Sequence, residues 1–492
     1  MDSQTQQLHF VLLPLMAPGH MIPMVDVARL LAQRGVLVTI VTTPLNADRF
    51  KTIIARATEA GLQIREIQLQ FPCVEVGLPE GCENFDMLPS MFAGGKFLYA
   101  CGMLQGPVEK LLEESKPQAS CLISDRCLPW VTNVAHKFHI PKLLFHACGC
   151  FPLSCMHHLQ VSRVFDDIKS ESGHFLVPGL PDPIELTIAA ITGCVKTNPS
   201  GPRDLRDDIR EGEEASYGFV VNTFQELETE YIKEYAKATG KKVWSIGPVS
   251  LCNKDNMDMA TRGNKSAINE NHCLNWLDSF EPRSVLYACL GSLSRLPTLQ
   301  MIELGLGLEA SNKPFIWVLR HKSNDFEKWI VEEKYEERIK GRGLLIHGWA
   351  PQVLILSHPA IGGFLTHCGW NSILEGVSAG VPMITWPMFS EQFLNEKLIV
   401  QVLGIGVRVG VEVEVNFGQE EEIGVLVEKN VVKMCVDELM GEEEEAEERR
   451  KRARELGRMA KMAVEEGGSS HTNMTLLIQD ILEQLNHVSD LS

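Results

Sequence analysis

The chain has 492 residues, and because one domain usually takes roughly 100 to 200 residues, two or three domains are expected. It holds 46 Lys and Arg against 64 Asp and Glu, a net charge of -18 with histidine neutral. Such an acidic balance disfavours nonspecific binding to nucleic acid or anionic lipid. With 45% hydrophobic and 22% charged residues, the composition is typical of a globular protein that binds small molecules or proteins.

The 14 cysteines are scattered and do not follow the spacing of zinc ligands, so free thiols, no metal and a cytoplasmic location are expected. The apolar stretch Phe10–Met24 lacks a preceding basic region and is broken by three prolines, which argues against a signal peptide. No apolar run reaches the roughly 18 residues of a membrane helix, so no integral membrane segment is expected. We also expect a monomer.

The first half of the chain alternates apolar runs with helical spacing. Phe10–Leu15 is a candidate strand, Met24–Gln33 has the spacing of a helix, and Val36–Thr43 returns to a β-branched run, which together predict a βαβ unit. Gly19 and His20 fall at its junction, where doubly wound folds bind ligands. Further strands are predicted at Cys121–Ser124, Lys142–Phe145 and Phe219–Asn222, with helices over Phe97–Glu114 and Gln225–Thr239.

The alternation stops at Ser250–Asn271, a polar stretch without periodicity that predicts a linker. It restarts with strands at Ser284–Leu290, Pro314–Arg320, Gly343–Gly348, Ala360–Thr366 and Pro382–Trp386 and helices at Leu299–Ala310 and Ser372–Ala379. We therefore predict an N-terminal domain over residues 1–250, a linker over 251–271, a second α/β domain over 272–470 and a C-terminal helix over 471–492 that packs back on the first domain. A cleft between two such domains is a frequent ligand site.

The segment Trp349–Gln392 carries most of the chemistry. Thr366–Ser372 follows a strand and opens a helix, so backbone N–H groups and the helix dipole converge where a phosphate can bind, with His367 beside them. Trp349 offers a flat face for a base, although a core tryptophan is the common alternative. Glu375 lies on the helix face of the phosphate site and suits ribose hydroxyls, although a capping-box contact is the alternative.

The pair Glu391-Gln392 follows the last predicted strand. A carboxylate accepts hydrogen bonds and an amide both donates and accepts them, which suits adjacent sugar hydroxyls. Base, ribose, phosphate and sugar contacts within one segment point to a nucleotide sugar.

This segment resembles the signature box of plant family 1 UDP-dependent glycosyltransferases. The resemblance extends to Pro18–Pro23, Leu122–Asp125 and Leu290–Ser294, and the stretch Gly77–Asn84 resembles the group that glycosylates triterpenoids and flavonoids. It implies a GT-B fold, which is an α/β fold of two Rossmann-like doubly wound domains facing across a cleft. It also implies a UDP-sugar donor, UDP-glucose in the first place, a small hydrophobic acceptor and no cofactor.

The resemblance also implies residue roles. Trp349 would stack on uracil, the Ala350 backbone would bind the base edge, and Gln352 and Glu375 would hold the ribose. Ser292, His367, Asn371 and Ser372 would hold the diphosphate at the turn that contains Gly369, and Trp370, Glu391 and Gln392 would line the sugar. Many relatives have aspartate where this chain has Glu391, and Gln392 favours glucose over galactose.

Transfer of a sugar to a hydroxyl needs a base, and His20 is the candidate because imidazole titrates near neutral pH. Asp125, at the end of another predicted strand, would fix its tautomer and stabilise the imidazolium. Attack opposite to UDP would invert the anomeric configuration. The chain has no Asp-x-Asp triplet, so we predict catalysis without a metal ion.

Three other functions are considered. Gly376–Gly380 matches the nucleophile elbow of hydrolases with Ser378 as nucleophile, but a helix precedes it and a strand follows, which is the wrong order. Gly305–Gly307 lacks the third glycine of a dinucleotide site. An inactive binder of UDP-sugars is the third, and UDP-glucuronate or UDP-galactose are alternative donors.

The acceptor is not identified, but its pocket is expected around Phe71–Phe92 and Cys148–Val164.

Overall fold

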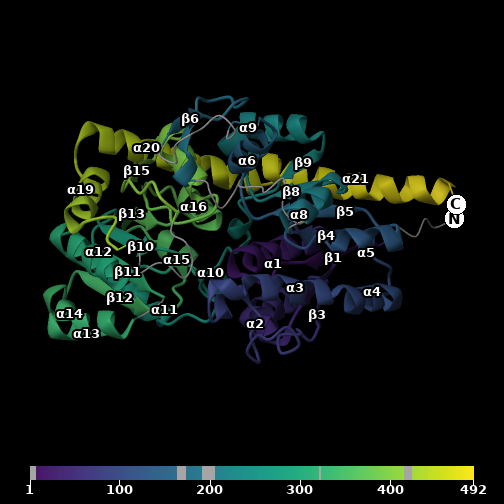
Figure 1. Cartoon of the computed structure of the whole chain (residues 1–492), viewed down its shortest axis with the longest axis horizontal. Helices are drawn as coiled ribbons and strands as arrows, with labels where there is room; N and C mark the ends of the chain where they lie inside the picture. The colour runs from purple at the N-terminus through teal and green to yellow at the C-terminus, as the bar shows by residue number, and fades with distance from the viewer. Residues whose placement is uncertain are drawn as a thin grey trace.

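The computed structural model describes residues 7–162, 164, 173–190, 205–320, 323–414 and 424–491. Figure 1 shows two α/β domains side by side, one purple to teal and the other green to yellow. Each domain is built on its own parallel sheet with helices on both faces. The GT-B architecture expected from the sequence is therefore confirmed.

The N-terminal sheet has the strand order β3-β2-β1-β4-β5-β8-β9, and every pairing in it is parallel. Its order reverses between β1 and β4, which makes their carboxyl ends the place for a ligand. The strands are β1 His9–Leu13, β2 Leu37–Thr42, β3 Ile64–Gln68, β4 Cys121–Asp125, β5 Lys142–His146, β8 Gly218–Val221 and β9 Lys242–Ser245.

The helices of this domain are α1 Pro18–Ala32, α2 Pro44–Glu59, α3 Gly94–Met103, α4 Gln105–Glu114, α5 Val131–Phe138, α6 Cys150–Ser162, α8 Leu205–Glu214 and α9 Gln225–Thr239. A small antiparallel pair, β6 His174–Leu176 and β7 Glu185–Thr187, lies outside the main sheet. The single helix predicted over Phe97–Glu114 is two helices, α3 and α4, that meet at Leu104.

The C-terminal sheet repeats the same topology with the order β12-β11-β10-β13-β14-β15. Its strands are β10 Val285–Cys289, β11 Phe315–Leu319, β12 Gly343–His347, β13 Ile361–Thr366, β14 Met383–Thr385 and β15 Gly406–Arg408. Around it lie α11 Glu270–Leu277, α12 Thr298–Ala310, α13 Asn324–Glu332, α14 Tyr335–Arg338, α15 Gln352–Leu356, α16 Trp370–Ala379, α17 Gln392–Lys397, α19 Lys429–Met440 and α20 Glu444–Val464. Here the order reverses between β10 and β13.

The first helix begins earlier than the sequence predicted. We expected a helix from Met24 with His20 in the loop before it, but α1 begins at Pro18, so His20 lies in the first helical turn. Pro18 at the first helical position explains the early start. Its fixed φ suits a helix, and the N–H that it lacks would have no partner within the helix at this position. His20 is thus held by a helix rather than by a loop.

The predicted linker contains two short helices, a 3-10 helix at Val249–Cys252 and α10 Asn256–Thr261. The last helix, α21 Ser469–Leu491, leaves the C-terminal domain and lies along the N-terminal one, as the yellow ribbon in Figure 1 shows. Its Met474, Leu477 and Ile481 pack into the N-terminal core. The carboxylate of Asp480 accepts hydrogen bonds from Tyr217 and Lys242.

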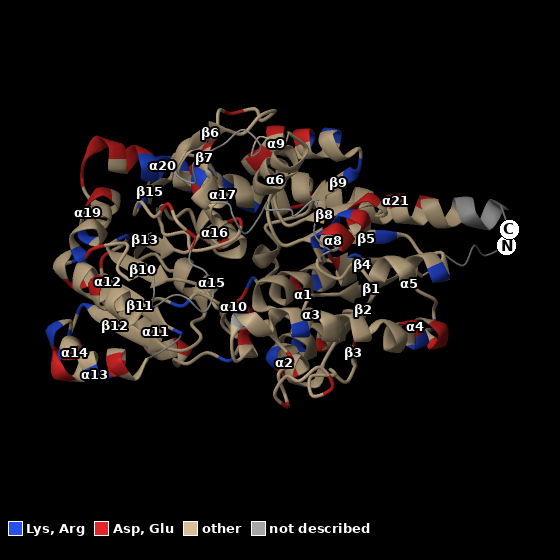
Figure 2. Cartoon of the chain, in the orientation of Figure 1, with Lys and Arg blue, Asp and Glu red and all other residues tan. Residues whose placement is uncertain are grey.

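Charged side chains lie mainly on the outer helices (Figure 2). Along α20, Glu445 pairs with Arg449 and Glu448 with Arg452, as the i, i+4 spacing predicts. Glu447 pairs with Arg450 and Arg454. Among the described residues, no helix is both long and apolar enough to cross a membrane.

Candidate active site

A cavity of about 1010 Å³ lies between the carboxyl ends of the two sheets. It is lined by His20 from the N-terminal domain and by all the residues predicted to hold the donor, namely Ser292, Trp349, Ala350, Gln352, His367, Gly369, Trp370, Asn371, Ser372, Glu375, Glu391 and Gln392. Asp125 does not line the cavity, because it lies fully buried behind His20. The structure thus gathers these residues at one place.

The imidazole of His20 is hydrogen-bonded through Nδ1 to Oδ2 of Asp125 at 2.7 Å. The two residues meet because His20 follows β1 and Asp125 ends β4, and these strands are neighbours in the sheet. The other carboxylate oxygen of Asp125 accepts the backbone N–H of Cys127 at 2.9 Å. The side chain of His20 is still 29% exposed. Asp125 thus holds the ring at Nδ1, while the rest of the ring is open to the cavity.

Electrostatics favour a charged pair. Burial alone would lower the pKa of His20, but the charge and hydrogen bond of Asp125 outweigh it, so this pKa lies above its usual value. Burial alone would raise the pKa of Asp125, but the charge and hydrogen bond of His20 hold it below its usual value. An imidazole with such a partner can take up a proton and be stabilised afterwards.

The backbone of α1 makes a direct contact with the other domain beside His20. Pro23 has no N–H to donate to the carbonyl of Gly19 four residues earlier. That carbonyl instead accepts a hydrogen bond from Nδ2 of Asn371 at 2.6 Å. Asn371, which we predicted as a diphosphate ligand, therefore also bridges the two domains, and Nδ2 of Asn222 lies 3.4 Å from its Oδ1.

The amino end of α16 and His367 form the part of the cavity suited to an anion. The helix begins at Trp370, after Gly369 in extended conformation, so its first N–H groups face the cavity end of β13. The ring of His367 lies against Gly291 and Gly369, where a Cβ atom would come 2.4 Å from Nε2. Burial lowers the pKa of His367 to about 4, so this imidazole is neutral at neutral pH.

Glu375 is the centre of a polar cluster rather than a helix cap. Its Oε2 accepts the amide of Gln352 at 2.7 Å, and its Oε1 is paired with Arg262 of the linker. The same Gln352 amide lies 3.0 Å from the hydroxyl of Ser372. The capping-box alternative is therefore excluded, and three predicted donor residues share one hydrogen-bond network.

Trp349 lies at the far end of the cavity, half-buried, against the linker and β11. The guanidinium carbon of Arg320 is 4.4 Å from the centre of its ring. Gly263 in the linker has φ +93, and a Cβ atom there would lie 2.4 Å from the indole. The backbone of Ala267 donates a hydrogen bond to the carbonyl of Trp349 at 2.8 Å. The indole plane is thus fixed by residues outside its own segment.

Glu391 and Gln392, expected at the sugar, both line the cavity, but the amide of Gln392 has less hydrogen-bonding capacity than predicted. Oε1 of Gln392 accepts the backbone N–H groups of Met388 and Phe389 at 3.0 and 3.2 Å. The amide nitrogen is therefore the group that can meet a ligand, as a donor only. One oxygen of Glu391 accepts the hydroxyl of Ser390 at 2.7 Å, which leaves further acceptor sites on the carboxylate.

Trp370 contacts the opposite domain from the start of α16. Its indole Nε1 donates to the carbonyl of Asn222 at 2.7 Å. Its ring lies against Gly149, where a Cβ atom would come 2.5 Å from the indole. The residue is almost fully buried, so it joins the two domains as well as lining the cavity.

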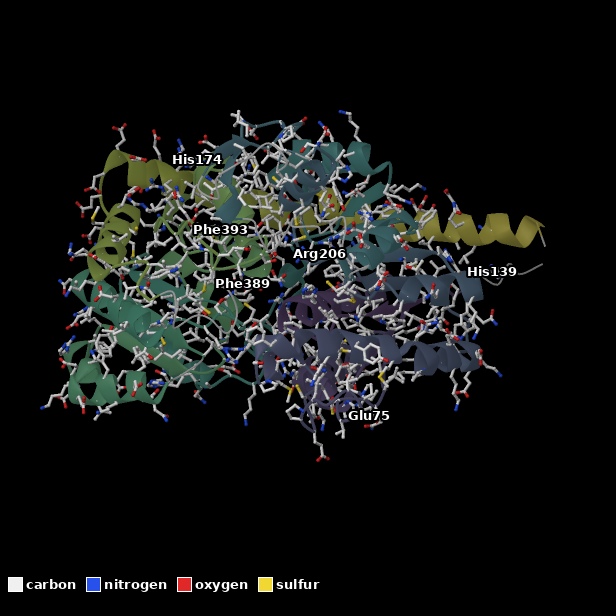
Figure 3. All side chains as sticks on the ribbon, viewed as in Figure 1. Glu75, His139, His174, Arg206, Phe389 and Phe393 are labelled. Atoms are coloured by element: carbon white, nitrogen blue, oxygen red, sulfur yellow. The ribbon has the colours of Figure 1, made fainter. Side chains whose placement is uncertain are left out.

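The part of the cavity near His20 is apolar. Its lining includes Leu15, Phe85, Phe92, Leu98, Cys127, Ala147 and Phe389, the last of which is labelled in Figure 3 near the middle of the molecule. Of the two segments expected to form an acceptor pocket, Phe71–Phe92 contributes Phe85 and Phe92. None of the described residues of Cys148–Val164 lines the cavity, because α6 packs into the core against α9. That part of the prediction was wrong, and α3 takes its place.

The geometry excludes the hydrolase alternative. Ser378 lies inside α16, is buried, and donates its hydroxyl to the carbonyl of Leu374 at 2.6 Å. A nucleophile elbow needs a strand, a sharp turn and then a helix. Gly305 and Gly307 likewise lie within α12 and not at the turn of a dinucleotide site. Among the described residues no group of three or more His, Cys, Asp or Glu side chains is placed to hold a metal ion.

Comparison with known families identifies the chain. Residues 6–251 match the model of the glycosyltransferase N-terminal domain, and residues 251–434 match that of UDP-glucoronosyl and UDP-glucosyl transferases. The chain is 57% identical over 486 residues to UDP-glycosyltransferase 73C2 of Arabidopsis thaliana and 56% identical over 485 residues to UDP-glycosyltransferase 73C25 of Barbarea vulgaris, with 98% of each chain covered in both cases. It is a GT-B glycosyltransferase, and it belongs to the plant UDP-glycosyltransferase family, whose members transfer a sugar to small molecules.

Solved structures agree with this assignment. UGT73P12 of Glycyrrhiza uralensis, complexed with glycyrrhetinic acid 3-O-monoglucuronide, is 36% identical with a TM-score of 0.90, covering 99% of this chain and 98% of that one. UGT89C1 of Arabidopsis thaliana, complexed with UDP-L-rhamnose, is 28% identical with a TM-score of 0.76, covering 97% of this chain and 100% of that one. The same enzyme is also known in complex with quercetin.

Three residues at the donor end of the cavity were missed by the sequence analysis. Arg320 ends a predicted strand, and its place at the carboxyl end of a parallel sheet could have drawn attention to it. Arg262 and Gly263 lie in the stretch interpreted as a linker, where no periodicity or motif singles out a residue. Only the folded chain shows that this stretch contacts Glu375 and Trp349.

Proposed function

We propose that this protein transfers a hexose, with glucose as the preferred sugar, from its UDP conjugate to a hydroxyl or carboxyl of a hydrophobic plant metabolite of the triterpenoid or flavonoid type. His20 is the general base and Asp125 its orienting carboxylate. The reaction inverts the anomeric configuration and needs neither a cofactor nor a metal ion. UDP-glucuronate and UDP-galactose are the alternative donors.

One observation carries the proposal. His20, backed by Asp125, and the amino end of α16 face one cavity from opposite domains. A base at one end and a site for an anionic leaving group at the other are what displacement at an anomeric carbon requires. A nucleophile deprotonated by His20 would attack from the side opposite to UDP, and this arrangement supports inversion.

The donor roles follow the positions in the cavity. Trp349 would stack on uracil with the Ala350 backbone at the base edge, and Gln352 and Glu375 would hold the ribose. The diphosphate would bind Ser292, His367, Asn371 and Ser372, with Gly369 leaving space for the His367 ring. Trp370, Glu391 and Gln392 would surround the sugar, where the Gln392 amide donates and the Glu391 carboxylate accepts.

The acceptor assignment is supported by the apolar lining near His20 and by the relatives. Phe85, Phe92 and Phe389 offer broad apolar faces to a polycyclic or aromatic molecule. The compounds seen with UGT73P12 and UGT89C1, a glycyrrhetinic acid derivative and quercetin, belong to the triterpenoid and flavonoid classes. Residues 1–250 are accordingly proposed as the acceptor domain and residues 272–470 as the donor domain of a monomeric cytoplasmic enzyme.

The test is a transfer assay with EDTA present. The protein is incubated with UDP-glucose, UDP-galactose or UDP-glucuronate and a panel of triterpenoids, flavonoids and small phenols, and products are followed by mass. We expect UDP-glucose to give the highest rate, EDTA to have no effect, and the proton coupling at the anomeric carbon to report a β-glucoside. Transfer from UDP-glucuronate alone would contradict the donor assignment, and loss of activity in EDTA would contradict the metal-independent mechanism.

A further inference from the structure

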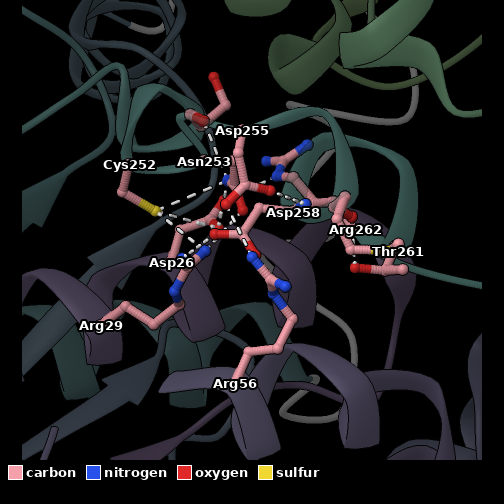
Figure 4. A network of polar contacts seen from close by, with 11 residues as sticks. Asp26, Arg29, Arg56, Cys252, Asn253, Asp255, Asp258, Thr261 and Arg262 are labelled. Carbon is pink, nitrogen blue, oxygen red and sulfur yellow. Dashed lines mark hydrogen bonds and ion pairs between the residues drawn. The ribbon is translucent and has the colours of Figure 1, made fainter. Parts of the chain in front are cut away.

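The linker between the two domains is held by a network of charged residues, most of them buried (Figure 4). Asp258 of α10 accepts hydrogen bonds from Arg29 of α1 and Arg56 of α2. Asn253 bonds Arg29 and Asp26 of α1 at 2.6 and 3.0 Å. These contacts fix the start of the linker to α2 and to α1, the helix that carries His20 in its first turn.

Arg262 continues this network into the donor site. Its Nε donates to Oδ2 of Asp26 at 2.8 Å, and its terminal nitrogen pairs with Oε1 of Glu375. The side chains of Asp26, Arg262 and Glu375 are only 1%, 7% and 6% exposed. One guanidinium from the linker thus bridges a carboxylate of α1 and a carboxylate of α16.

We propose that Arg262 is a positioning residue of the donor site, which holds the Glu375 carboxylate for the ribose hydroxyls and ties it to α1 through Asp26. This inference rests on the ribose role of Glu375 proposed above. Each carboxylate oxygen has two lone-pair positions. With Arg262 on Oε1 and Gln352 on Oε2, one position on each oxygen remains for a hydroxyl, and the carboxylate plane is fixed from both ends.

The charge of Arg262 matters for the same reason. Asp26 and Glu375 place two buried carboxylates near a site for an anionic diphosphate, and a buried charge without a partner is strongly unfavourable. Arg262 neutralises much of this negative charge. A planar guanidinium can donate hydrogen bonds to both carboxylates at once from differently directed N–H groups. The compact ammonium of lysine cannot reproduce that geometry.

The residue after Arg262 strengthens the case that the linker belongs to the site. Gly263 lies against the indole of Trp349, and a Cβ atom there would also come 2.9 Å from Ile22 of α1. Arg262 and Met259 themselves line the cavity. Consecutive linker residues therefore support the proposed ribose ligand and the proposed base-stacking ring, each in contact with α1.

The experiment compares UDP with 2′,3′-dideoxyuridine diphosphate as ligands in calorimetric titrations of the full chain. If Glu375 binds the ribose hydroxyls, the wild type should prefer UDP by about 10-fold or more, since bonds to a charged group are strong. We expect Arg262→Met to reduce this preference to near unity and Arg262→Lys to reduce it partly. Glu375→Gln should lower the same preference, and adding Arg262→Met to it should have little further effect.

Arg29→Met is the matched control. Arg29 is buried to the same degree, with 8% of its side chain exposed, and pairs with Asp258 of the same network, but it does not line the cavity. It should lower the melting temperature and keep the preference for UDP. An Arg262→Met or Arg262→Lys variant that is folded by circular dichroism and keeps the full preference overturns the inference. A wild type that binds neither nucleotide overturns the proposed function instead.

Discussion

Each domain places a histidine at the point where the strand order of its sheet reverses, yet the two side chains differ in their surroundings. His20 follows the first strand of one sheet and His367 follows the fourth strand of the other, and both lie where the strand order reverses. His20 has a buried carboxylate at 2.7 Å, which holds its pKa above the usual value. His367 is packed against Gly291 and Gly369, and burial lowers its pKa to about 4.

The difference shows how one fold supplies two kinds of chemistry. A histidine whose protonated form is stabilised can accept a proton from a substrate. A histidine held neutral can donate one N–H to a phosphate without changing charge near neutral pH. The fold sets the position of each ring, and the neighbouring residue, Asp125 or a pair of glycines, sets what the ring does.

Removal of the base should have the largest effect. We expect His20→Ala to lower kcat by about 10²- to 10⁴-fold, the usual contribution of a general base, with the Kd of UDP changed little because the ring lies in the acceptor domain. Single-turnover rates and calorimetric titrations measure the two quantities. In His367→Ala, the paired variant, we expect the reverse, with a higher Kd of UDP and little change in kcat. A His20→Ala variant with wild-type kcat would contradict the proposed mechanism.

The carboxylate that distinguishes the two histidines can be neutralised. Because Asp125 raises the pKa of His20, the neutral, active form predominates only above that raised value, and the rate should fall on the acidic side of it. In Asp125→Asn the pKa of His20 falls, so the acidic limb of the pH–rate profile should move to lower pH. The plateau should drop by up to about tenfold for each pH unit of that movement, because the base is weaker. It should drop further because the amide N–H of Asn faces Nδ1 and favours the tautomer with its proton on Nε2.

The profile is measured as kcat/KM against pH with a saturating second substrate. Asn keeps the shape of Asp, so the backbone bond to Cys127 is retained and the fold should persist. An acidic limb that stays at the same pH in Asp125→Asn would show that Asp125 does not set the protonation of His20.

The neutral histidine should matter for binding rather than for chemistry. We expect His367→Ala to weaken UDP-glucose binding by about 10- to 100-fold, the range for a hydrogen bond to a charged group, with a smaller loss in His367→Gln, which keeps a donor. Because its pKa is about 4, the affinity of the wild type for UDP-glucose should be constant between about pH 6 and 8. A titration that follows a group with pKa near 6.5 would place a charged histidine at the phosphates.

Both sheets and the positions of the two histidine sites could be predicted from the sequence. The alternation of strands and helices predicted both sheets, and the turn before Ser372 and the position of His20 after the first strand predicted the two ends of the site. Strands at the sheet edges, such as β3 and β15, were missed because their segments lack a long apolar run. The start of α1 has a local signal in Pro18, which the helical spacing from Met24 hid. The contact of Arg262 with Glu375 joins residues far apart in the chain, and no local pattern encodes it.

The smallest expected effect concerns the backbone that joins the two histidine sites. The carbonyl of Gly19, next to His20, accepts the amide of Asn371 because Pro23 cannot donate to it. Pro23→Ala restores an N–H that competes for this carbonyl. Since a carbonyl has two lone pairs, the competition is partial, and we expect kcat to fall only about two- to fivefold, equivalent to a hydrogen bond of about 0.5 to 1 kcal/mol, while the helix gains stability.

A double-mutant cycle isolates this contact. Pro23→Ala should lower kcat in the wild type but have no further effect in Asn371→Ala, because the bond it weakens is then absent. Thermal unfolding provides the control, since the gain in melting temperature from Pro23→Ala should be the same in both backgrounds. Equal losses of kcat in the two backgrounds would mean that Pro23 acts through the shape of α1 and not through the contact between Gly19 and Asn371.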